Sequence, residues 1–237
     1  MFGHGIDRHL VSVTNPGSME AEQYQALRVK LERLQRERDF KVVAITSPGA
    51  REGKSVTAAN LAAALARGGN TRVLLIEADM RRPSMPRYLG LDDSPAGSLS
   101  GLLVDSSATL IDSIQKHDAL PFDLLLAGTA TTPVGELLRS RRLEEVIREA
   151  RDQYDFVVLD TPPLGPVSDC ALLARYVDGV LLVVSAHLTP RKQLETALNQ
   201  LDANAVLGIV FNRDDRPVFG YRHSYYRGYF PPHTRKQ

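Results

Sequence analysis

Six short apolar runs divide the chain at fairly regular intervals. They are rich in Val, Leu and Ile and cover residues 42–46, 73–76, 124–127, 156–159, 180–184 and 206–211. Runs of this length that do not alternate with polar residues are typical of strands covered on both faces. Helical patterning lies between them, at residues 55–67, 133–150, 169–176 and 191–201. The pattern predicts an α/β fold with a mostly parallel central sheet flanked by helices.

The regions before and after these runs have different patterns. From Ser18 onwards apolar residues recur at near-heptad spacing, at Tyr24, Leu27, Leu31 and Leu34. This spacing predicts a long amphipathic helix, capped by Ser18 and favoured by Glu20 and Glu22 in its first turn. Residues 1–17 lack such periodicity, and residues 213–237 combine Gly and Pro without it. We therefore expect an irregular N-terminal segment, one domain over residues 18–212 and a flexible tail.

Composition narrows the class of protein. The chain has 237 residues, which suits one well-buried domain with tails. Its net charge of +1 gives no overall field that would favour nucleic acid. A single cysteine, Cys170, excludes an intrachain disulfide framework and predicts a reducing, cytoplasmic compartment. No run approaches the ~20 apolar residues of a membrane span, and no signal-peptide core follows Met1. We expect membrane association only through a partner.

A phosphate-binding loop is predicted directly after the first apolar run. The sequence from Ser47 to Ser55 reads SPGAREGKS, and an Ala-rich helical segment follows it. Backbone N–H groups of such a loop bind phosphates at the positive end of a helix, Lys54 would reach the β- and γ-phosphates, and the Ser55 hydroxyl would bind Mg²⁺. The strict pattern has Gly where this chain has Pro48. The predicted ATP contacts are Gly49, Ala50, Arg51, Glu52, Gly53, Lys54, Ser55 and Val56.

Carboxylates end two further apolar runs. Glu77 and Asp79 follow the second run and, two residues apart, leave the same face of the strand end. Asp160 ends the fourth run and precedes Thr161-Pro162-Pro163, an arrangement typical of a Walker B motif that supports Mg²⁺. Carboxylates at such strand ends bind hydrated Mg²⁺ or accept a proton from a nucleophile. The alternative, an acidic turn at a strand end, is less favoured beside the phosphate loop.

Asn212 and Cys170 give weaker evidence about function. Asn212 ends the last apolar run, where its amide could hydrogen-bond adenine, but a turn-forming Asn explains it equally well. Cys170 is best interpreted as a small residue in a helix behind the Walker B loop. The six histidines have no metal-ligand spacing, so we predict none as a ligand.

Together these motifs resemble Walker A, Walker A′ and Walker B of bacterial tyrosine kinases, the autokinases of capsule and exopolysaccharide assembly. The most specific pieces are residues 75–83 (LIEADMRRP) and 159–163 (LDTPP), and the likeness runs from about Glu20 to the C-terminus. It implies a P-loop NTPase fold and an ATP- and Mg²⁺-dependent protein-tyrosine kinase. The family usually has Asp at position 77, and it implies a catalytic base there, here Glu77. It implies Mg²⁺ support from Asp79. With Lys54 and Asp160 these two complete the predicted catalytic set.

The resemblance also implies an assembly and partners. The family's oligomerisation motif, one Glu and two Arg at three-residue intervals, matches Glu22, Gln25 and Arg28, with Gln25 replacing the middle Arg. This implies a ring-shaped homo-oligomer. The lack of a membrane span is similar to the two-component form of the family, in which a separate transmembrane polysaccharide co-polymerase activates the kinase at the inner face of the membrane. A tyrosine phosphatase is expected to reset the cycle.

The tail holds a cluster of tyrosines. Four of the eight tyrosines of the chain lie there, Tyr221, Tyr225, Tyr226 and Tyr229. The cluster could accept phosphate, form a basic and aromatic arm for nucleic acid or a membrane surface, or be a simple packed or disordered tail. The phosphate loop and the family's C-terminal tyrosine cluster favour the first interpretation, so these four residues are the predicted phosphoacceptors.

Two other functions compete with a kinase. One is an ATPase switch of the partition or division-site type, but such proteins carry a signature Lys where this chain has Gly49, and they lack a tyrosine cluster. The other is a small-molecule ligase or a reductase component on the same fold. A reductase needs more cysteines than Cys170, and nothing marks a small substrate. We predict phosphoryl transfer from MgATP to the phenol groups of the chain's own tail.

Overall fold

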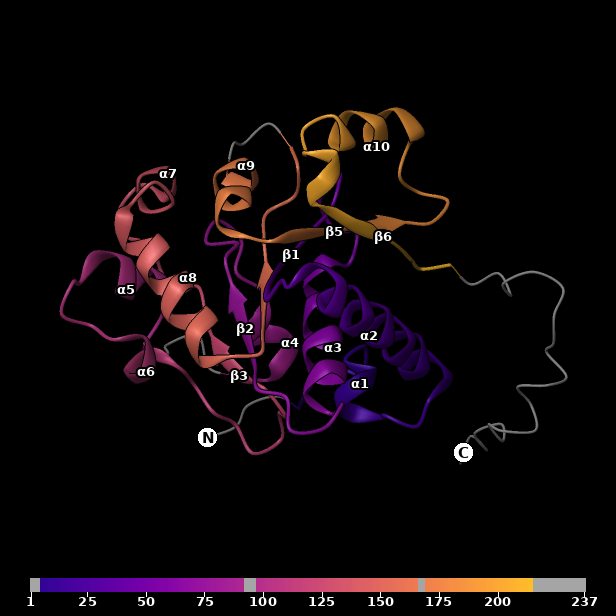
Figure 1. Cartoon of the computed structure of the whole chain (residues 1–237), viewed down its shortest axis with the longest axis horizontal. Helices are drawn as coiled ribbons and strands as arrows, with labels where there is room; N and C mark the ends of the chain where they lie inside the picture. The colour runs from indigo at the N-terminus through magenta and orange to yellow at the C-terminus, as the bar shows by residue number, and fades with distance from the viewer. Residues whose placement is uncertain (1–4, 92–96, 166–168, 215–237) are drawn as a thin grey trace, which may run out of the picture.

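A computed structural model describes residues 5–91, 97–165 and 169–214. One six-stranded sheet forms its centre, and all neighbouring strands in it are parallel (Figure 1). The strands lie side by side in the order β3 (Asp123–Leu125), β2 (Val73–Glu77), β4 (Phe156–Asp160), β1 (Val42–Thr46), β5 (Gly179–Ser185) and β6 (Val206–Asn212). Every residue of β1, β2, β4 and β5 is buried, which explains their continuously apolar sequences. The predicted parallel α/β fold is confirmed.

Helices cover both faces of this sheet (Figure 1). One face shares a hydrophobic core with α1 (Val11–Thr14), α2 (Met19–Arg38), α3 (Lys54–Ala66) and α4 (Met85–Leu89). The other face packs against α5 (Leu99–Val104), α6 (Leu110–Ser113), α7 (Val134–Leu137) and α8 (Arg141–Gln153). Over β5 lie α9 (Asp169–Leu173) and α10 (Arg191–Leu198), and two 3₁₀ turns, η1 (Ala174–Tyr176) and η2 (Ala203–Ala205), precede β5 and β6. Within the described ranges no helix is long and apolar enough to cross a bilayer.

The predicted amphipathic helix is α2. Its cap forms as expected, because the Ser18 hydroxyl accepts a hydrogen bond from the Ala21 N–H at 3.1 Å. Leu31 is fully buried in the core, and Leu27 and Leu34 pack against the same core from its margin. The apolar spacing therefore marks the face of α2 that covers α3.

The N-terminal segment contributes more to the core than its sequence predicts. Leu10 is fully buried, and residues 11–14 form α1. The buried Asn60 of α3 holds this segment, since its Oδ1 accepts from the Ser12 N–H at 2.8 Å and its Nδ2 donates to the His9 carbonyl at 2.9 Å. The described part of residues 1–17 is thus not irregular throughout. A partner about 50 residues away in the chain orders it, which periodicity does not reveal.

Candidate active site

The predicted phosphate loop lies at the carboxyl edge of the sheet, where ligands of open α/β sheets bind. Residues 47–53 connect β1 to α3, and α3 begins at Lys54. Gly53 has a left-handed backbone with φ of 93°, and a Cβ there would lie 2.0 Å from Nδ2 of Asn212. Only glycine fits this position. The loop therefore delivers backbone N–H groups and the N-terminus of the 13-residue α3 to one place, as phosphate binding requires.

Two strands hold this loop in place. The buried Glu52 carboxylate accepts from the N–H of Ser185, which ends β5, at 2.9 Å and from the hydroxyl of Thr189 in the following loop at 2.7 Å. Asn212, at the end of β6, donates from Nδ2 to the Glu52 carbonyl at 2.8 Å. In this structure the Asn212 amide and the Glu52 side chain thus shape the loop. Ser185 and Thr189 carry no sequence motif, and sequence analysis did not find them.

A buried lysine and two buried aspartates meet beside the loop. Lys54 is 9% exposed, and its Nζ lies 3.0 Å from Oδ2 of Asp79 and 3.6 Å from Oδ1 of Asp160. Burial opposes the charge of Lys54, but the carboxylates of Asp160 and Asp79 outweigh it and raise the pKa of Lys54. The ammonium group is therefore charged at neutral pH. The structure brings together three of the four predicted catalytic residues.

Asp160 has the most unusual environment of this group. It is fully buried, and among the described residues neither of its oxygens has a hydrogen-bond partner. Burial raises its pKa to about 6, although the nearby Lys54 charge acts in the opposite direction. A buried carboxylate that lacks hydrogen bonds is costly unless a ligand uses it, even with the Lys54 ammonium 3.6 Å away.

These oxygen groups fit a magnesium ion. Ser55 provides a hydroxyl beside Lys54, and Ser84 donates to that hydroxyl at 3.1 Å. No three His, Cys, Asp or Glu side chains converge as a metal cage in the part of the chain that the structure describes. Mg²⁺ is commonly bound by one or two carboxylates together with water and substrate phosphates, so a complete protein cage is not needed. The Asp160 oxygens, which have no hydrogen-bond partner among the described residues, and the Ser55 hydroxyl suit that mode.

Glu77 lies at the end of β2, and backbone N–H groups bind both of its carboxylate oxygens. It is fully buried, and its Oε1 accepts from the backbone N–H groups of Ser84 and of Met85, the latter at 2.7 Å. Its Oε2 accepts from the Ala127 N–H at 3.2 Å. Burial raises the pKa of Glu77, while these three donors act to lower it. Both oxygens are engaged in holding backbone, which does not favour the predicted role of Glu77 as a base.

An ion pair joins the Walker A′ loop to the Walker B side of the site. Arg81 donates from Nε and Nη2 to the two carboxylate oxygens of Asp169 at the start of α9. The Asp169 side chain is almost fully buried, and this bidentate pairing raises the pKa of Arg81. Sequence analysis missed the pair, because 88 residues separate its members. The neighbouring Cys170 is buried in α9 as expected and donates to the Thr46 hydroxyl at 3.4 Å.

The predicted oligomerisation motif is not part of this centre. The oligomerisation motif lies on α2, where Glu22 is exposed and Gln25 and Arg28 are half-buried. Arg28 pairs with Glu32 at 3.8 Å and lies against Gly68. The predicted phosphoacceptors Tyr221, Tyr225, Tyr226 and Tyr229 lie outside the described residues.

The fold and this edge define a P-loop nucleotide-binding protein. Residues 40–203 match the model of a family described as AAA domain. The chain is 36% identical over 212 residues to tyrosine-protein kinase YwqD of Bacillus subtilis (strain 168), covering 89% of this chain and 88% of that protein. It is 32% identical to the succinoglycan biosynthesis transport protein ExoP of Rhizobium meliloti (strain 1021), over 92% of this chain but only 29% of ExoP. The solved kinase domain of Escherichia coli tyrosine kinase ETK superposes with a TM-score of 0.79 and 28% identity, covering 92% and 87% of the two chains.

The chain therefore belongs to the bacterial tyrosine kinase family, as its motifs predict. The kinase interpretation is favoured over a partition-type switch. The match to ExoP covers less than a third of that protein, so this chain corresponds to one part of the longer relative.

Proposed function

We propose that this chain transfers the γ-phosphoryl group of ATP to tyrosines of its own C-terminal tail. The observation that carries the proposal is the buried Lys54, held between Asp79 and Asp160 at the start of α3. Such a lysine supplies a fixed positive charge where a phosphate loop positions the β- and γ-phosphates. The acceptors are Tyr221, Tyr225, Tyr226 and Tyr229.

The loop residues 49–56 would hold the nucleotide, with the adenine on the side of Asn212. Asp160 and Ser55 would hold Mg²⁺, with Asp79 supporting it through bound water so that its Oδ2 stays free, and the ion would supply positive charge that neutralises the phosphate oxygens. Asp160 is suited to this because neither of its oxygens has a hydrogen-bond partner among the described residues. A bound cation would also remove the cost of keeping Asp160 charged in a buried place.

We assign the proton-accepting role to Asp79 rather than to Glu77. Asp79 is bound through Oδ2 to Lys54, while its Oδ1 accepts from the Arg82 N–H at 3.2 Å. When Lys54 engages a phosphate, Oδ2 loses its partner and can accept the proton of an incoming phenol. The carboxylate would thus become available only beside a bound nucleotide. A phenol, with an ordinary pKa of about 10, needs less help from a base than a serine hydroxyl does.

The proposal extends to where the kinase acts. We propose a homo-oligomer that uses Glu22, Gln25 and Arg28, works beside a transmembrane polysaccharide co-polymerase at the inner face of the membrane, and is reset by a tyrosine phosphatase. ExoP is named for succinoglycan biosynthesis, and this supports an extracellular polysaccharide as the regulated product.

Mass mapping of the tail tests the proposal directly. After incubation with MgATP the wild-type chain should carry phosphate on one or more of the four tail tyrosines. A variant with all four replaced by Phe should bind ATP equally well and carry no tail phosphate. Absence of phosphate from the wild-type tail, even with the co-purified membrane activator, would overturn the proposal.

A further inference from the structure

We propose that the Arg51 side chain binds the β-phosphate of the nucleotide and stabilises the ADP leaving group during phosphoryl transfer. The inference rests on the proposed function and adds to its site a side chain to which no motif assigns a role. The phosphate-loop pattern leaves position 51 open, and the contact predicted there from the sequence belongs to the backbone of the loop. The proposal concerns the guanidinium group alone.

Arg51 has a backbone conformation that suits glycine better than arginine. Its φ is 63°, in the left-handed region, and Gly53, two residues later, has φ of 93°. Left-handed residues in such loops turn successive N–H groups toward one concave side, where an anion binds. Glycine has no steric penalty in this region, whereas a long side chain has one. The loop thus carries an arginine under strain, and strain of this kind is concentrated at functional sites.

No hydrogen bond or ion pair of the Arg51 side chain compensates for this strain within the described ranges. The side chain is exposed. The adjacent carboxylate, that of Glu52, is buried and accepts hydrogen bonds from Ser185 and Thr189 instead. A free guanidinium group in a phosphate loop is therefore available to a ligand that brings its own negative charge, and its planar fork of donors matches phosphate oxygens.

The place of Arg51 along the loop favours the β-phosphate. Backbone N–H groups of a phosphate loop surround the α- and β-phosphates, and the lysine at its end reaches the β- and γ-phosphates. Lys54 is buried between Asp79 and Asp160. Arg51 lies three residues earlier and is exposed. Lys54 would thus reach the phosphates from within the protein, and Arg51 from the solvent side of the same loop.

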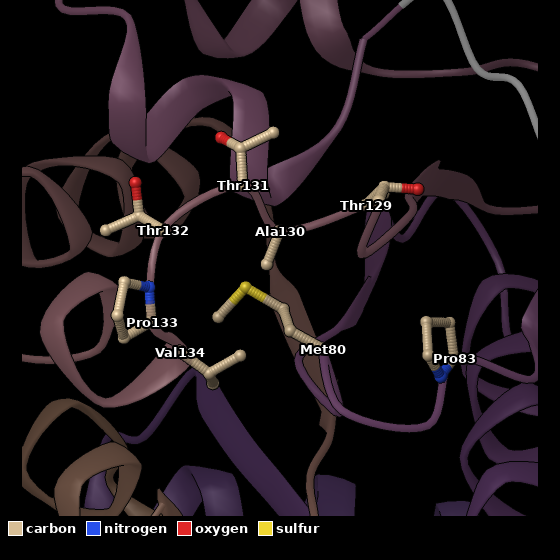
Figure 2. A pocket seen from close by; sticks show the side chains of 9 residues that line it. Met80, Pro83, Thr129, Ala130, Thr131, Thr132, Pro133 and Val134 are labelled. Atoms are coloured by element: carbon tan, nitrogen blue, oxygen red, sulfur yellow. The ribbon is translucent and has the colours of Figure 1, made fainter.

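The cavity beside the Walker A′ loop does not offer a charge of this kind. Its volume is about 580 Å³, and it is lined by Met80, Pro83 and residues 128–134. Figure 2 shows that these side chains are apolar or end in threonine hydroxyls, and none of them is charged. Arg81, in the same loop, is already paired with Asp169. Neither the cavity nor Arg81 therefore supplies a free cation to the phosphates.

The chemistry of the transfer explains what a cation at the β-phosphate does. The bond from the γ-phosphorus to the oxygen that bridges the β- and γ-phosphates breaks. The phenol oxygen bonds to the same phosphorus, and its proton passes to Asp79. The electron pair of the broken bond stays on ADP, so negative charge grows on the β-phosphate. Arg51 therefore stabilises the transition state more than the bound substrate, and it raises the rate as well as the affinity.

Arg51→Gly separates the side chain from the backbone strain. Glycine relieves the left-handed strain, so the nucleotide-free variant should unfold at a temperature up to about 4 °C above that of the wild type. It also removes the cation, so the Kd for MgADP should rise about three- to ten-fold. The single-turnover rate at saturating MgATP should fall at least about five-fold. An arginine without a ligand contact would not lose binding while the protein gains stability.

Arg51→Lys and Arg67→Ala complete the comparison. Arg51→Lys keeps the charge and the strain, so its Kd for MgADP should rise less than about three-fold. The difference between the wild type and Arg51→Gly should shrink at about 1 M salt, where the screening length is about 3 Å. Arg67→Ala is the matched control, because Arg67 is exposed at the opposite end of α3 and its loss removes the same charge. MgADP binding and transfer should not change in this variant.

Each other outcome has a defined meaning. An unchanged Kd for MgADP in Arg51→Gly at about 0.05 M salt rules out the contact. A loss that Arg51→Lys shares and that salt does not reduce belongs to the loop backbone, and it also rules out the contact. If the wild type binds MgADP but phosphorylates no tail tyrosine, the proposed function has failed, and the MgADP titrations still decide whether Arg51 binds the β-phosphate.

A second neutral variant covers the case in which glycine makes the loop too flexible to bind any nucleotide. Asparagine is uncharged and tolerates a left-handed backbone, so Arg51→Asn then takes the place of Arg51→Gly. Its Kd for MgADP should rise by the same three- to ten-fold. An unchanged Kd in Arg51→Asn rules out the contact.

Discussion

The Lys54 ammonium group lies 3.0 Å from the Asp79 carboxylate, inside the site where the nucleotide phosphates are expected. The lysine therefore has a partner that a phosphate must displace. This relationship links the two proposed roles, phosphate binding by Lys54 and proton acceptance by Asp79.

We predict that Lys54→Met abolishes tail phosphorylation and weakens ATP binding at least ten-fold, because no other described side-chain cation occupies this buried position. Calorimetric titration with MgATP and phosphotyrosine detection measure the two effects. Lys41→Met is the matched control, since Lys41 binds the Arg151 carbonyl at the opposite, amino end of β1. Normal phosphate incorporation by the Lys54→Met chain would contradict the phosphate-loop assignment.

Asp160→Asn should stabilise the nucleotide-free protein while removing its activity. Burial raises the folded-state pKa of Asp160 to about 6, from an ordinary value near 3.8. Below about pH 4 both the folded and the unfolded states hold the proton, so the carboxyl costs nothing. As the pH rises to about 6 the unfolded state loses the proton first, and the wild type loses stability that the Asn variant retains. At pH 7 the difference should reach about 1–3 kcal/mol.

Urea unfolding at pH 4, 5, 6 and 7, without metal or nucleotide, checks this prediction. The stability gap between the variant and the wild type should widen from pH 4 to 6 and then stay constant. Equal stability at pH 7 would contradict the raised pKa of Asp160 and would mean that the Lys54 ammonium fully compensates the buried carboxylate.

Sequence patterns predicted those parts of the fold that depend on local spacing. The six strands, the loop before Lys54 and the cap at Ser18 each follow from neighbouring residues. The end of β3 is less predictable: Leu126 and Ala127 continue the apolar run, but β3 ends at Leu125. Their carbonyls instead accept from the backbone N–H groups of Leu99 and Ser100 at the start of α5. The position at which β3 ends therefore depends on hydrogen bonds with Leu99 and Ser100, which are not its neighbours in the sequence.

The same distinction between local sequence patterns and distant contacts applies to the candidate site. The motifs placed Lys54, Asp79 and Asp160 at one edge because parallel strands end together. The Walker A′ motif also suggested a catalytic base at Glu77. The Glu77 carboxylate instead accepts a hydrogen bond from Ala127, which lies 50 residues further along the chain. The sequence pattern of an acidic residue at a strand end is the same whether its carboxylate faces the substrate or accepts hydrogen bonds from backbone N–H groups. Only tertiary contacts distinguish the two arrangements.

The Arg81–Asp169 pair should couple the two loops of the site. We predict that Arg81→Ala and Asp169→Ala each slow autophosphorylation, because either change frees the Walker A′ loop that carries Asp79. The double variant should be no slower than the worse single variant, since the two residues act through one contact. Initial rates at saturating MgATP for the wild type, the two single variants and the double variant form a double-mutant cycle. Arg82→Ala is the matched neighbouring control. Multiplicative losses in the double variant would show that the residues act independently.

Glu77 and Asp79 should respond differently to the loss of charge. If Glu77 positions backbone, Glu77→Gln keeps an oxygen for the Ser84 and Met85 N–H groups and loses only the bond to Ala127. It should destabilise the protein by about 1–3 kcal/mol, the cost of one unsatisfied buried donor, and slow transfer less than ten-fold. Asp79→Asn removes the proposed proton acceptor and should slow transfer by about 10²–10⁴.

Glu77→Asp separates the two roles most sharply. Aspartate keeps the negative charge and the basicity, so a catalytic base at this position would survive the change. Its side chain is one methylene shorter, and it cannot reach Ser84 and Met85 on one side and Ala127 on the other. A positioning role therefore predicts that Glu77→Asp is slower and less stable than Glu77→Gln, because the loops after β2 and β3 lose the contact that joins them. Single-turnover rates and thermal unfolding measure these quantities on the wild type and the two variants. The opposite ranking, with Glu77→Asp near wild type and Glu77→Gln inactive at full stability, would restore Glu77 as the base.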